Sequence, residues 1–329
     1  MNRFALSRDA IKRLDGWSTG AQALVLLDSA HKLGWTRFLV RPRRLAAIVR
    51  FTALPQDRVQ NVLEALAALG VVELNGDEAR LSAPFAEMMT PDGFAMLSEK
   101  LAQARLTARL LSKVVESNGA PVLSGDDSLT IARGVTFQPA QVGRDLFRET
   151  LESLPEYTAA VRRGRVLDVG CGVASGLLTT AAIFPEIRGL GLELVPAVAA
   201  EAVRRAKAQG VDDRVEIRAI DARDFDETAA YDACFWAQPF FSDHARLPTL
   251  QAIHRALAPG GVLLEQELES EPEDPAGQAA FAMRRMVFRA QSVPFAPSAE
   301  CLAAEAASAG FTLVRIASTN LGRMVVLQR

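Results

Sequence analysis

The segment that most constrains the fold of this chain is RVLDVGCGVASG, residues 165–176. An apolar run leads into Asp168, and two glycines follow at positions 170 and 172. This order predicts a buried strand, a glycine turn and the start of a helix. The segment GLGLELVP, residues 189–196, predicts the next strand, with Glu193 at its end. Together the two segments indicate a nucleotide pocket.

The carboxylate of Asp168 indicates which kind of nucleotide the pocket binds. Gly170 and Gly172 let the backbone approach a ligand closely, and Glu193 suits two ribose hydroxyls, features that a dinucleotide site shares. A pyrophosphate on the helix N-terminus, however, would face Asp168 and be repelled by it. The third glycine of the dinucleotide fingerprint is also replaced, by Ser175. S-adenosylmethionine, which has no phosphate and carries an ammonium and a sulfonium, is therefore favoured over NAD.

The composition indicates a globular protein with small-molecule partners. With 329 residues the chain is expected to form two or three units, and 49% hydrophobic residues supply a sizeable core. The net charge of −2 favours neither a nucleic-acid surface nor an acidic tail. None of the three histidines pairs with cysteine at zinc-ligand spacing, so no metal site is expected.

Cysteine usage and the absence of long apolar runs point to the cytoplasm. Three widely spaced cysteines favour reduced thiols over a disulfide framework. The N-terminus lacks the apolar core of a signal peptide, and no apolar stretch reaches the ~18 residues needed to span a bilayer. We expect a cytoplasmic protein without membrane contact.

The first 90 residues predict a winged helix. Periodicity indicates helices at residues 20–34, 45–49 and 55–69, and a hairpin with its turn at Asn75 and Gly76 follows. Such folds often read DNA, and four arginines lie between residues 41 and 50. The presumed recognition helix, QDRVQNVLEALAALG, is nevertheless largely apolar, which favours packing over base reading. The segment is interpreted as a dimerisation domain of a homodimer.

Two further domains are predicted. Residues 91–162 form a helical linker that contributes to the substrate pocket, with a polar Gly/Ser/Asp-rich break at residues 119–134. From residue 163 to 329, strand and helix signals alternate, which implies a parallel sheet with helices on both faces. The fold class is therefore α/β: a Rossmann-like, doubly wound sheet behind a mainly helical N-terminal domain.

This C-terminal half resembles the class I S-adenosylmethionine-dependent methyltransferases. The resemblance rests on LDVGCG, GLELVP, AIDARDF, YDACFWAQ and RALAPGG, in that order. With the winged helix, the chain is similar over nearly its whole length to small-molecule O-methyltransferases of secondary metabolism.

The resemblance implies the cofactor-binding residues. Asp168, Gly170 and Gly172 would line the methionine portion, and Glu193 would bind the ribose hydroxyls. Further cofactor contacts are expected at the adenine end and after the fourth strand of the catalytic domain, from Leu194, Asp221, Ala222, Phe225, Trp236 and Gln238.

The catalytic base of that family is not where the resemblance places it. O-methyltransferases of this architecture carry a histidine shortly after the fourth strand, in a segment resembling LHDW, whereas this chain reads WAQPFFSDH. His244, oriented by Asp243, is one replacement for the base, and Glu265 or Glu267 after the next strand is another. A solvated loop histidine explains His244 equally well.

The same segment leaves the reaction open. Five residues are expected in the substrate pocket: Tyr157, Phe240, Phe241, Met283 and Met286. Aromatic rings beside a sulfonium also suit a reaction without a base, in which the amino group of S-adenosylmethionine closes a small amino-acid ring and methylthioadenosine leaves. A methyltransferase of a small metabolite is the main hypothesis. The cofactor cyclase and a winged-helix regulator are the alternatives.

Overall fold

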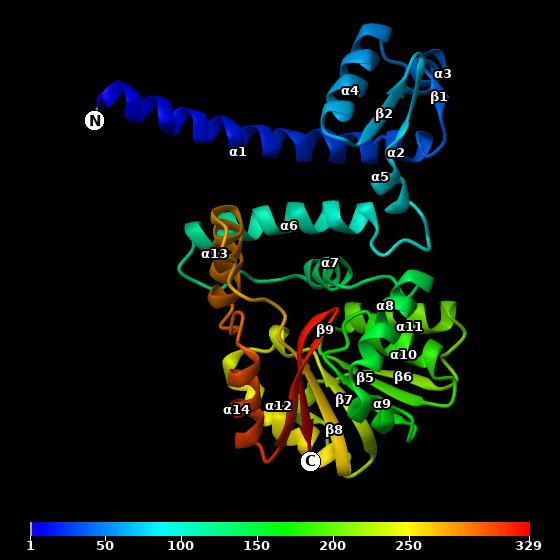
Figure 1. The fold of residues 1–329 in the computed structure, drawn as a ribbon, viewed down its shortest axis with the longest axis vertical. Coiled ribbons are helices and arrows are strands. Elements are labelled where there is room, and N and C mark those ends of the chain that lie inside the picture. Colours follow the sequence, from blue (N-terminus) through cyan, green and yellow to red (C-terminus); the bar gives the residue numbers. More distant parts are fainter. Residues whose placement is uncertain (1) are drawn as a thin grey trace. The chain divides into compact units, whose positions relative to one another are not determined.

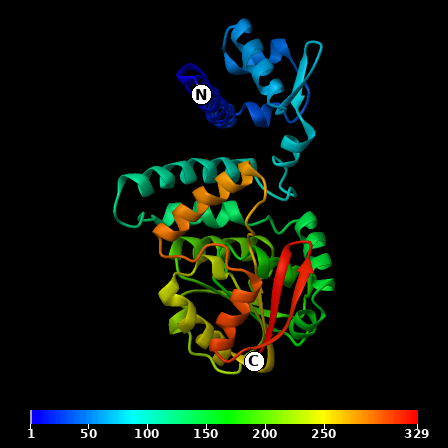
Figure 2. The same ribbon diagram turned by 60° about the vertical axis from the view of Figure 1, so that its left-hand side comes forward.

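A computed structural model describes residues 2–329, shown as ribbons in Figures 1 and 2. The chain divides after Leu101 into two compact units, each with its own core. The division lies inside one helix, α6 (Leu97–Glu116). Its first residues pack into the core of the first unit, whereas Leu106 and Leu110 pack within the second.

The first unit combines short helices with a small antiparallel sheet in the order β1-β3-β2. Its core is built around Trp35, Ile48 and Leu63. The elements are α1 (Arg3–Lys32), α2 (Trp35–Phe38), β1 (Arg43–Arg44), α3 (Leu45–Thr52), α4 (Gln56–Ala68), β2 (Val72–Asn75), β3 (Glu78–Leu81) and α5 (Ala83–Glu87).

The N-terminal helix is longer than the sequence predicted. We expected a start at Gly20, but α1 begins at Arg3, where the side chain of Asn2 accepts a hydrogen bond from the amide of Phe4 and caps the helix. Glycine inside a helix costs only about 1 kcal/mol relative to alanine, so Gly16 and Gly20 do not end it. The predicted hairpin is present as β2 and β3.

Some arginines of this unit make contacts within it. Arg43 donates to the carbonyl of Phe38 and lies over its ring, and Arg44 is 3.9 Å from Glu78. Arg43 is thus engaged within the unit, whereas the side chain of Arg44 stays 75% exposed.

The second unit is an α/β domain around a seven-stranded sheet in the order β6-β5-β4-β7-β8-β10-β9. Its remaining helices are α7 (Gly125–Val135), α8 (Gln141–Glu152), α9 (Pro155–Val161), α10 (Ser175–Ile183), α11 (Pro196–Ala208), α12 (Asp243–Ala256), α13 (Pro275–Ala290) and α14 (Ala299–Ser308). Its strands are β4 (Arg165–Val169), β5 (Arg188–Glu193), β6 (Val215–Ala219), β7 (Tyr231–Trp236), β8 (Leu257–Gln266), β9 (Thr312–Thr319) and β10 (Gly322–Gln328).

Helices cover both faces of this sheet, as expected of a doubly wound fold (Figures 1 and 2). One face packs against α9, α10 and α11, and the other against α12 and α14. Strands β4 to β8 are parallel. The sheet then ends in an antiparallel hairpin, β9 and β10, which the sequence analysis did not assign.

A helix occupies most of the segment that was predicted to be a polar break. Residues 119–134 were wrongly read as a loop, because their Gly, Ser and Asp residues are turn formers. Ser124 and Asp127 instead form a capping box that starts α7: each side chain accepts the other residue's backbone N–H. The signal was present in the sequence as Ser-x-x-Asp.

Helix α7 is fixed to α11 by a buried carboxylate. Glu201, on α11, pairs with Arg133 of α7 and with Arg204 and Arg205 of its own helix. These hydrogen bonds, chiefly from Arg204, lower the pKa of Glu201 to about 2. Helix α7 also reaches the turn after β4, where a Cβ added at Gly172 would contact Ala132 at 3.8 Å.

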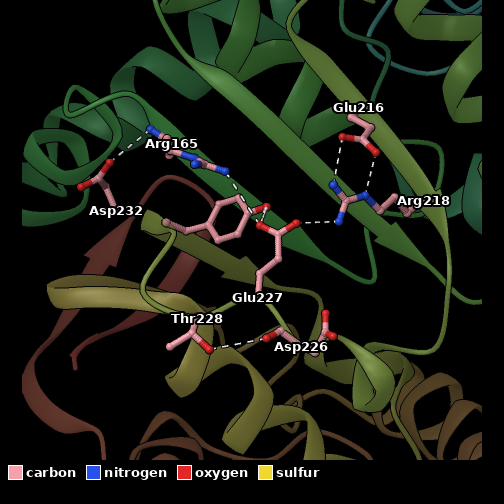
Figure 3. Close-up of polar contacts among 8 residues, drawn as sticks. Arg165, Glu216, Arg218, Asp226, Glu227, Thr228 and Asp232 are labelled. Carbon is pink, nitrogen blue, oxygen red and sulfur yellow. Dashed lines mark hydrogen bonds and ion pairs between the residues drawn. The ribbon is translucent and has the colours of Figure 1, made fainter.

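The amino edge of the sheet is closed by paired charges (Figure 3). Glu227 accepts hydrogen bonds from Arg218 at 2.7 Å and from the Tyr231 hydroxyl at 2.9 Å, and it lies 3.8 Å from Arg165. Arg218 also pairs with Glu216. A surface hollow lies beside these pairs and is lined by charged side chains of both signs, among them Arg188, Asp212 and Arg214.

Among the helices of residues 2–329, none combines the length and the apolar character needed to cross a bilayer.

Candidate functional site

The candidate site lies where the strand order of the sheet reverses. From β4 the chain builds outward through β5 and β6 on one side, and later through β7 and β8 on the other. In open α/β sheets, ligands bind in the crevice beyond the carboxyl ends of the strands at this switch point. The loops after β4 and β7 form its two walls.

The glycines of the first loop are required by its geometry. Gly170 has φ +73°, and a Cβ there would lie 2.8 Å from the ring of Phe241. Gly172 has φ +57°, and a Cβ there would meet only Ala132, at 3.8 Å. A Cβ at the second glycine would therefore make only an ordinary contact, so its positive φ is what favours glycine there.

Two carboxylates face this loop from neighbouring strands. Asp168 lies in β4 and is 5% exposed, and its neighbour Glu193 ends β5. One oxygen of Glu193 accepts the amide of Gly172 at 3.0 Å, and the other accepts the amide of Val195 at 2.9 Å. Glu193 thus spans the turn, and each oxygen keeps a lone pair for a hydroxyl.

Both carboxylates hold their protons more strongly than usual. Burial, and secondly the charge of Glu193, raises the pKa of Asp168 to about 7. Burial likewise raises the pKa of Glu193. Within residues 2–329 neither forms an ion pair with Arg, Lys or His. A cationic ligand would supply the missing opposite charge.

The residues that were predicted to contact the adenine end of the cofactor follow strands β5 and β6. Asp221 caps the short helix η1 (Ala222–Asp224) by accepting the amide of Arg223, whose guanidinium it also binds at 2.7 Å. These hydrogen bonds from Arg223 lower the pKa of Asp221. Ala222 and Phe225 are buried, whereas Leu194 is 63% exposed. The interpretation of Asp221 as a helix cap is confirmed. Its predicted contact with the adenine amino group stays a prediction.

The loop after β7 carries the other predicted cofactor contacts. Trp236 is fully buried, its ring 5.4 Å from that of Phe241 in an edge-on arrangement. Gln238 starts the short helix η2 (Gln238–Phe240) and is also fully buried. Phe241 covers the Gly170 turn, whereas Phe240 is 45% exposed. The three aromatic side chains predicted to cluster therefore lie in different places. Phe241 covers the turn, Trp236 lies beneath Phe241, and Phe240 faces solvent.

His244 and Asp243 lie on the exposed first turn of α12. The ring of His244 is 3.4 Å from the hydroxyl of Ser242, and its charge contributes to lowering the pKa of Asp221. No contact joins either residue to Asp168 or Glu193 in the described chain. The structure therefore leaves both residues exposed and without a contact to the two carboxylates of the glycine turn.

Glu265 lies on the opposite face of the sheet from Asp168. In the strand register it stands beside Trp236 and Val325, whose side chains pack under α12 and α14, whereas Asp168 stands beside Phe235. Its carboxyl is fully buried, and neither oxygen has a hydrogen-bond partner. Burial, and secondly Glu305, raises its pKa to about 8. Glu267, the other proposed base, binds Arg323 and the amide of Ala299.

The remaining predicted pocket residues come from three places. Tyr157, on α9, is buried on the same face of the sheet as Asp168, and burial raises its pKa well above the usual range. Met283 and Met286 are both about 45% exposed on α13. That helix is held against α6 by Val287, which packs with Leu106 and Leu110.

Sequence reasoning missed two contributors. Arg246 on α12 binds Gln238 and covers Trp236, yet it follows no motif that would have singled it out. Helix α7, with Ala132 beside Gly172, was hidden in the predicted break. Across residues 2–329, no three His, Cys, Asp or Glu side chains gather in a metal-binding arrangement.

Part of the second unit matches a known family model. Residues 166–261 match the family model described as a methyltransferase domain. This range includes the glycine turn, Glu193, the η2 loop and the start of β8. No curated protein sequence matches the chain.

Solved structures match nearly the whole chain at low identity. A mitomycin 7-O-methyltransferase is 19% identical, with a TM-score of 0.69 and 99% of each chain covered. Human N-acetylserotonin methyltransferase, solved with S-adenosylmethionine, is 16% identical, with a TM-score of 0.70 and 97% of each chain covered. A riboflavin-type N,N-dimethyltransferase from Streptomyces davawensis is 19% identical, with a TM-score of 0.66, covering 97% of this chain and 99% of that one. The fold is that of the class I S-adenosylmethionine-dependent methyltransferases.

Proposed function

We propose that this chain, which carries a methyltransferase domain, transfers the methyl group of S-adenosylmethionine to a small metabolite. The observation that supports this most is the pair of carboxylates formed by the buried Asp168 and the half-buried Glu193, which face the glycine turn without a cationic partner.

The residues at this edge fit that cofactor. Asp168 suits an ammonium group, since a buried carboxylate gains most from an opposite charge. Glu193 keeps acceptor lone pairs for ribose hydroxyls, and Asp221 lies at the next strand end for the adenine amine. When bound, S-adenosylmethionine supplies an electrophilic methyl group on a sulfonium.

The chain's own contribution to the transfer is alignment and exclusion of water. Phe241 and Ala237 close one side of the Gly170 turn, and Trp236 lies beneath Phe241. Holding a nucleophile in line with a reactive carbon can by itself supply about 7–11 kcal/mol of the barrier. We assign no base role to the buried Glu265. His244, with Asp243, is retained as the proposed proton acceptor for a hydroxyl substrate entering over η2.

The acceptor is a small molecule bearing oxygen or nitrogen. The similar solved proteins include an O-methyltransferase of mitomycin and an N,N-dimethyltransferase of a riboflavin derivative, so this fold accommodates both atoms. The exposed side chains of Phe240, Met283 and Met286 supply apolar surface for such a molecule. We place the enzyme in secondary metabolism on the same grounds.

The proposal is tested with S-adenosylmethionine that carries a deuterated methyl group. Incubation of the purified chain with this cofactor and a metabolite extract is expected to give a trideuteromethylated product and an equal amount of S-adenosylhomocysteine, both detected by mass spectrometry. Glu193→Gln turns an amide donor toward the Gly172 N–H, so we expect it to raise KM for the cofactor at least about tenfold.

Two results would contradict methyl transfer. Release of methylthioadenosine from S-adenosylmethionine alone would identify the cofactor as the substrate of a cyclisation. Failure to consume the cofactor under any condition would remove the chain from this enzyme class.

The proposal includes a homodimer formed through residues 1–90. Helix α1 exposes several large apolar side chains, among them Phe4, Ile11, Leu14 and Trp17, which is 70% exposed. Such side chains are stabilised when a partner covers them. We expect light scattering to give twice the chain mass, and Trp17→Glu to give the monomer. Lys12→Glu on the same helix is the control, and a monomeric wild type would overturn the assignment.

A further inference from the structure

The charged cluster beneath the η2 loop has no role in the reaction as proposed so far. It consists of Arg246 on α12, Glu305 on α14, Gln238 in η2 and Glu265 at the end of β8. All of these belong to the second unit, and three of the four side chains are fully or almost fully buried. Burying an arginine is costly, so its contacts must compensate.

Arg246 is held on one side by a two-pronged ion pair. Its Nε donates to one oxygen of Glu305 at 2.7 Å, and Nη2 donates to the other at 2.6 Å. This parallel geometry fixes the plane of the guanidinium. The arginine side chain is only 4% exposed, whereas that of Glu305 is 28% exposed.

On its other side Arg246 holds the loop after β7. Nη1 donates to both the backbone carbonyl and the side-chain oxygen of Gln238, at 2.8 and 3.0 Å. The amide nitrogen of Gln238 then donates to the carbonyl of Gln266 at 3.1 Å. The guanidinium also lies 4.9 Å from the centre of the Trp236 ring. One side chain thus joins the end of β7, η2 and, through Gln238, the end of β8.

The loop that Arg246 holds forms a wall of the candidate site. The amide of Ala237 donates to the carbonyl of Val169 at 2.9 Å, and the ring of Phe241 rests on Gly170. Displacement of Gln238 would therefore move the wall that faces the glycine turn.

Arg246 holds the η2 loop only while the carboxyl group of Glu265 is neutral. Arg246 and Glu305 are the charged neighbours that act on it, and its two oxygens have no hydrogen-bond partner. A single guanidinium that already pairs with Glu305 cannot fully compensate a second, buried carboxylate. While Glu265 keeps its proton, Arg246 stays with Glu305 and Gln238.

We propose that Arg246, held by Glu305, is a positioning residue that fixes residues 236–241 in the conformation that binds the cofactor. The inference rests on the proposed function, since it concerns the wall of the same site. It assigns no proton transfer and no substrate contact to Arg246.

The test uses the full chain in a Trp17→Phe background, so that Trp236 and the buried Trp35 remain as fluorophores. Glu305→Gln frees one side of the guanidinium, and Arg246→Lys removes its fork while keeping the charge. For each variant we would measure acrylamide quenching without ligand and the Kd for S-adenosylhomocysteine by calorimetry.

Both variants are expected to make Trp236 more accessible to quencher and to weaken ligand binding about tenfold, the scale of a slightly misplaced site wall. The matched control is another two-pronged pair, Arg315 with Glu156, which joins β9 to α9 at 2.8 and 2.9 Å. Glu156→Gln and Arg315→Lys should leave both readouts at the wild-type values.

An unchanged Kd in Glu305→Gln and Arg246→Lys would overturn the inference, as would an equal loss in the control pair. If Arg246→Lys does not fold, Glu305→Gln decides, because its side chain is partly exposed. Failure of the wild type to bind S-adenosylhomocysteine would overturn the proposed function instead, and the ligand-free quenching would still decide whether Arg246 holds the loop.

Discussion

Replacing Asp168 with asparagine is expected to remove tight binding of S-adenosylmethionine and, at the same time, to stabilise the ligand-free protein. Loss of one partner from a buried charge pair costs about 2–5 kcal/mol, so Kd should rise at least about 30-fold. A residue that served only the fold would not give these opposite effects. Calorimetric titration and urea unfolding measure the two quantities.

The sign of the stability change follows from the raised pKa of Asp168. The unfolded chain releases this proton near pH 3.8, whereas the folded protein keeps it to about pH 7. Between these values the folded state binds more protons, so its stability falls as pH rises. At pH 8 the ionisation of Asp168 lowers the free energy of unfolding by at most about 4 kcal/mol, and Asp168→Asn removes this loss.

Asp232 offers a matched control at the opposite edge of the sheet. Its carboxylate pairs with Arg163 at 3.1 Å and accepts the amide of Arg165 at 3.2 Å. Asp232→Asn should therefore lower stability and leave cofactor affinity unchanged. Equal affinity in Asp168→Asn and the wild type would show that Asp168 does not face the cofactor.

Replacing Glu265 with glutamine is expected to change how stability depends on pH. The carboxyl of Glu265 has a pKa of about 8 in the folded protein, against 4.5 ordinarily. Its burial therefore destabilises the fold increasingly as pH rises from about 5 to 8. The unfolding free energy of Glu265→Gln, relative to the wild type, should increase across this range by up to about 4–5 kcal/mol.

Urea unfolding of both proteins at pH 5, 7 and 9 measures this difference. Glu271→Gln, at an exposed position shortly after β8, is the control and should give a difference that does not vary with pH. A constant difference for Glu265→Gln as well would mean that the carboxyl is ionised in the folded protein. The neutrality of Glu265 could then not explain why Arg246 stays with Gln238.

The sequence predicted the parts of this protein that follow local patterns. Apolar runs that end in an acid or a glycine located β4 and β5, and these put Asp168 and Glu193 at one edge of the sheet. Side chains whose neighbours come from distant segments could not be placed. The alternation of glutamates after β8 did not reveal that Glu265 points away from Asp168, because that depends on the register of β8 against β7 and β10.

Helix α7 and Arg246 were missed for different reasons. The Gly/Ser/Asp-rich start of α7 fits a loop and a capped helix equally, and contact with α11 through Glu201 decides between them. The contacts of Arg246 could not be predicted from its neighbours in the sequence, because Glu305, which α14 places beside it, is 59 residues away. The roles of Tyr157, Phe240, Met283 and Met286 as pocket residues stay predictions.

We expect Asp168 to bind the cationic cofactor in its ionised form, so that binding releases the proton that Asp168 holds in the ligand-free protein. Calorimetric titration of the wild type with S-adenosylmethionine at pH 6.5, in two buffers of different ionisation enthalpy, should show net release of up to about one proton. Asp168→Asn should lose both the binding and the release. No heat of binding in the wild type, or tight binding without proton release, would show that Asp168 does not bind a cationic cofactor in its ionised form.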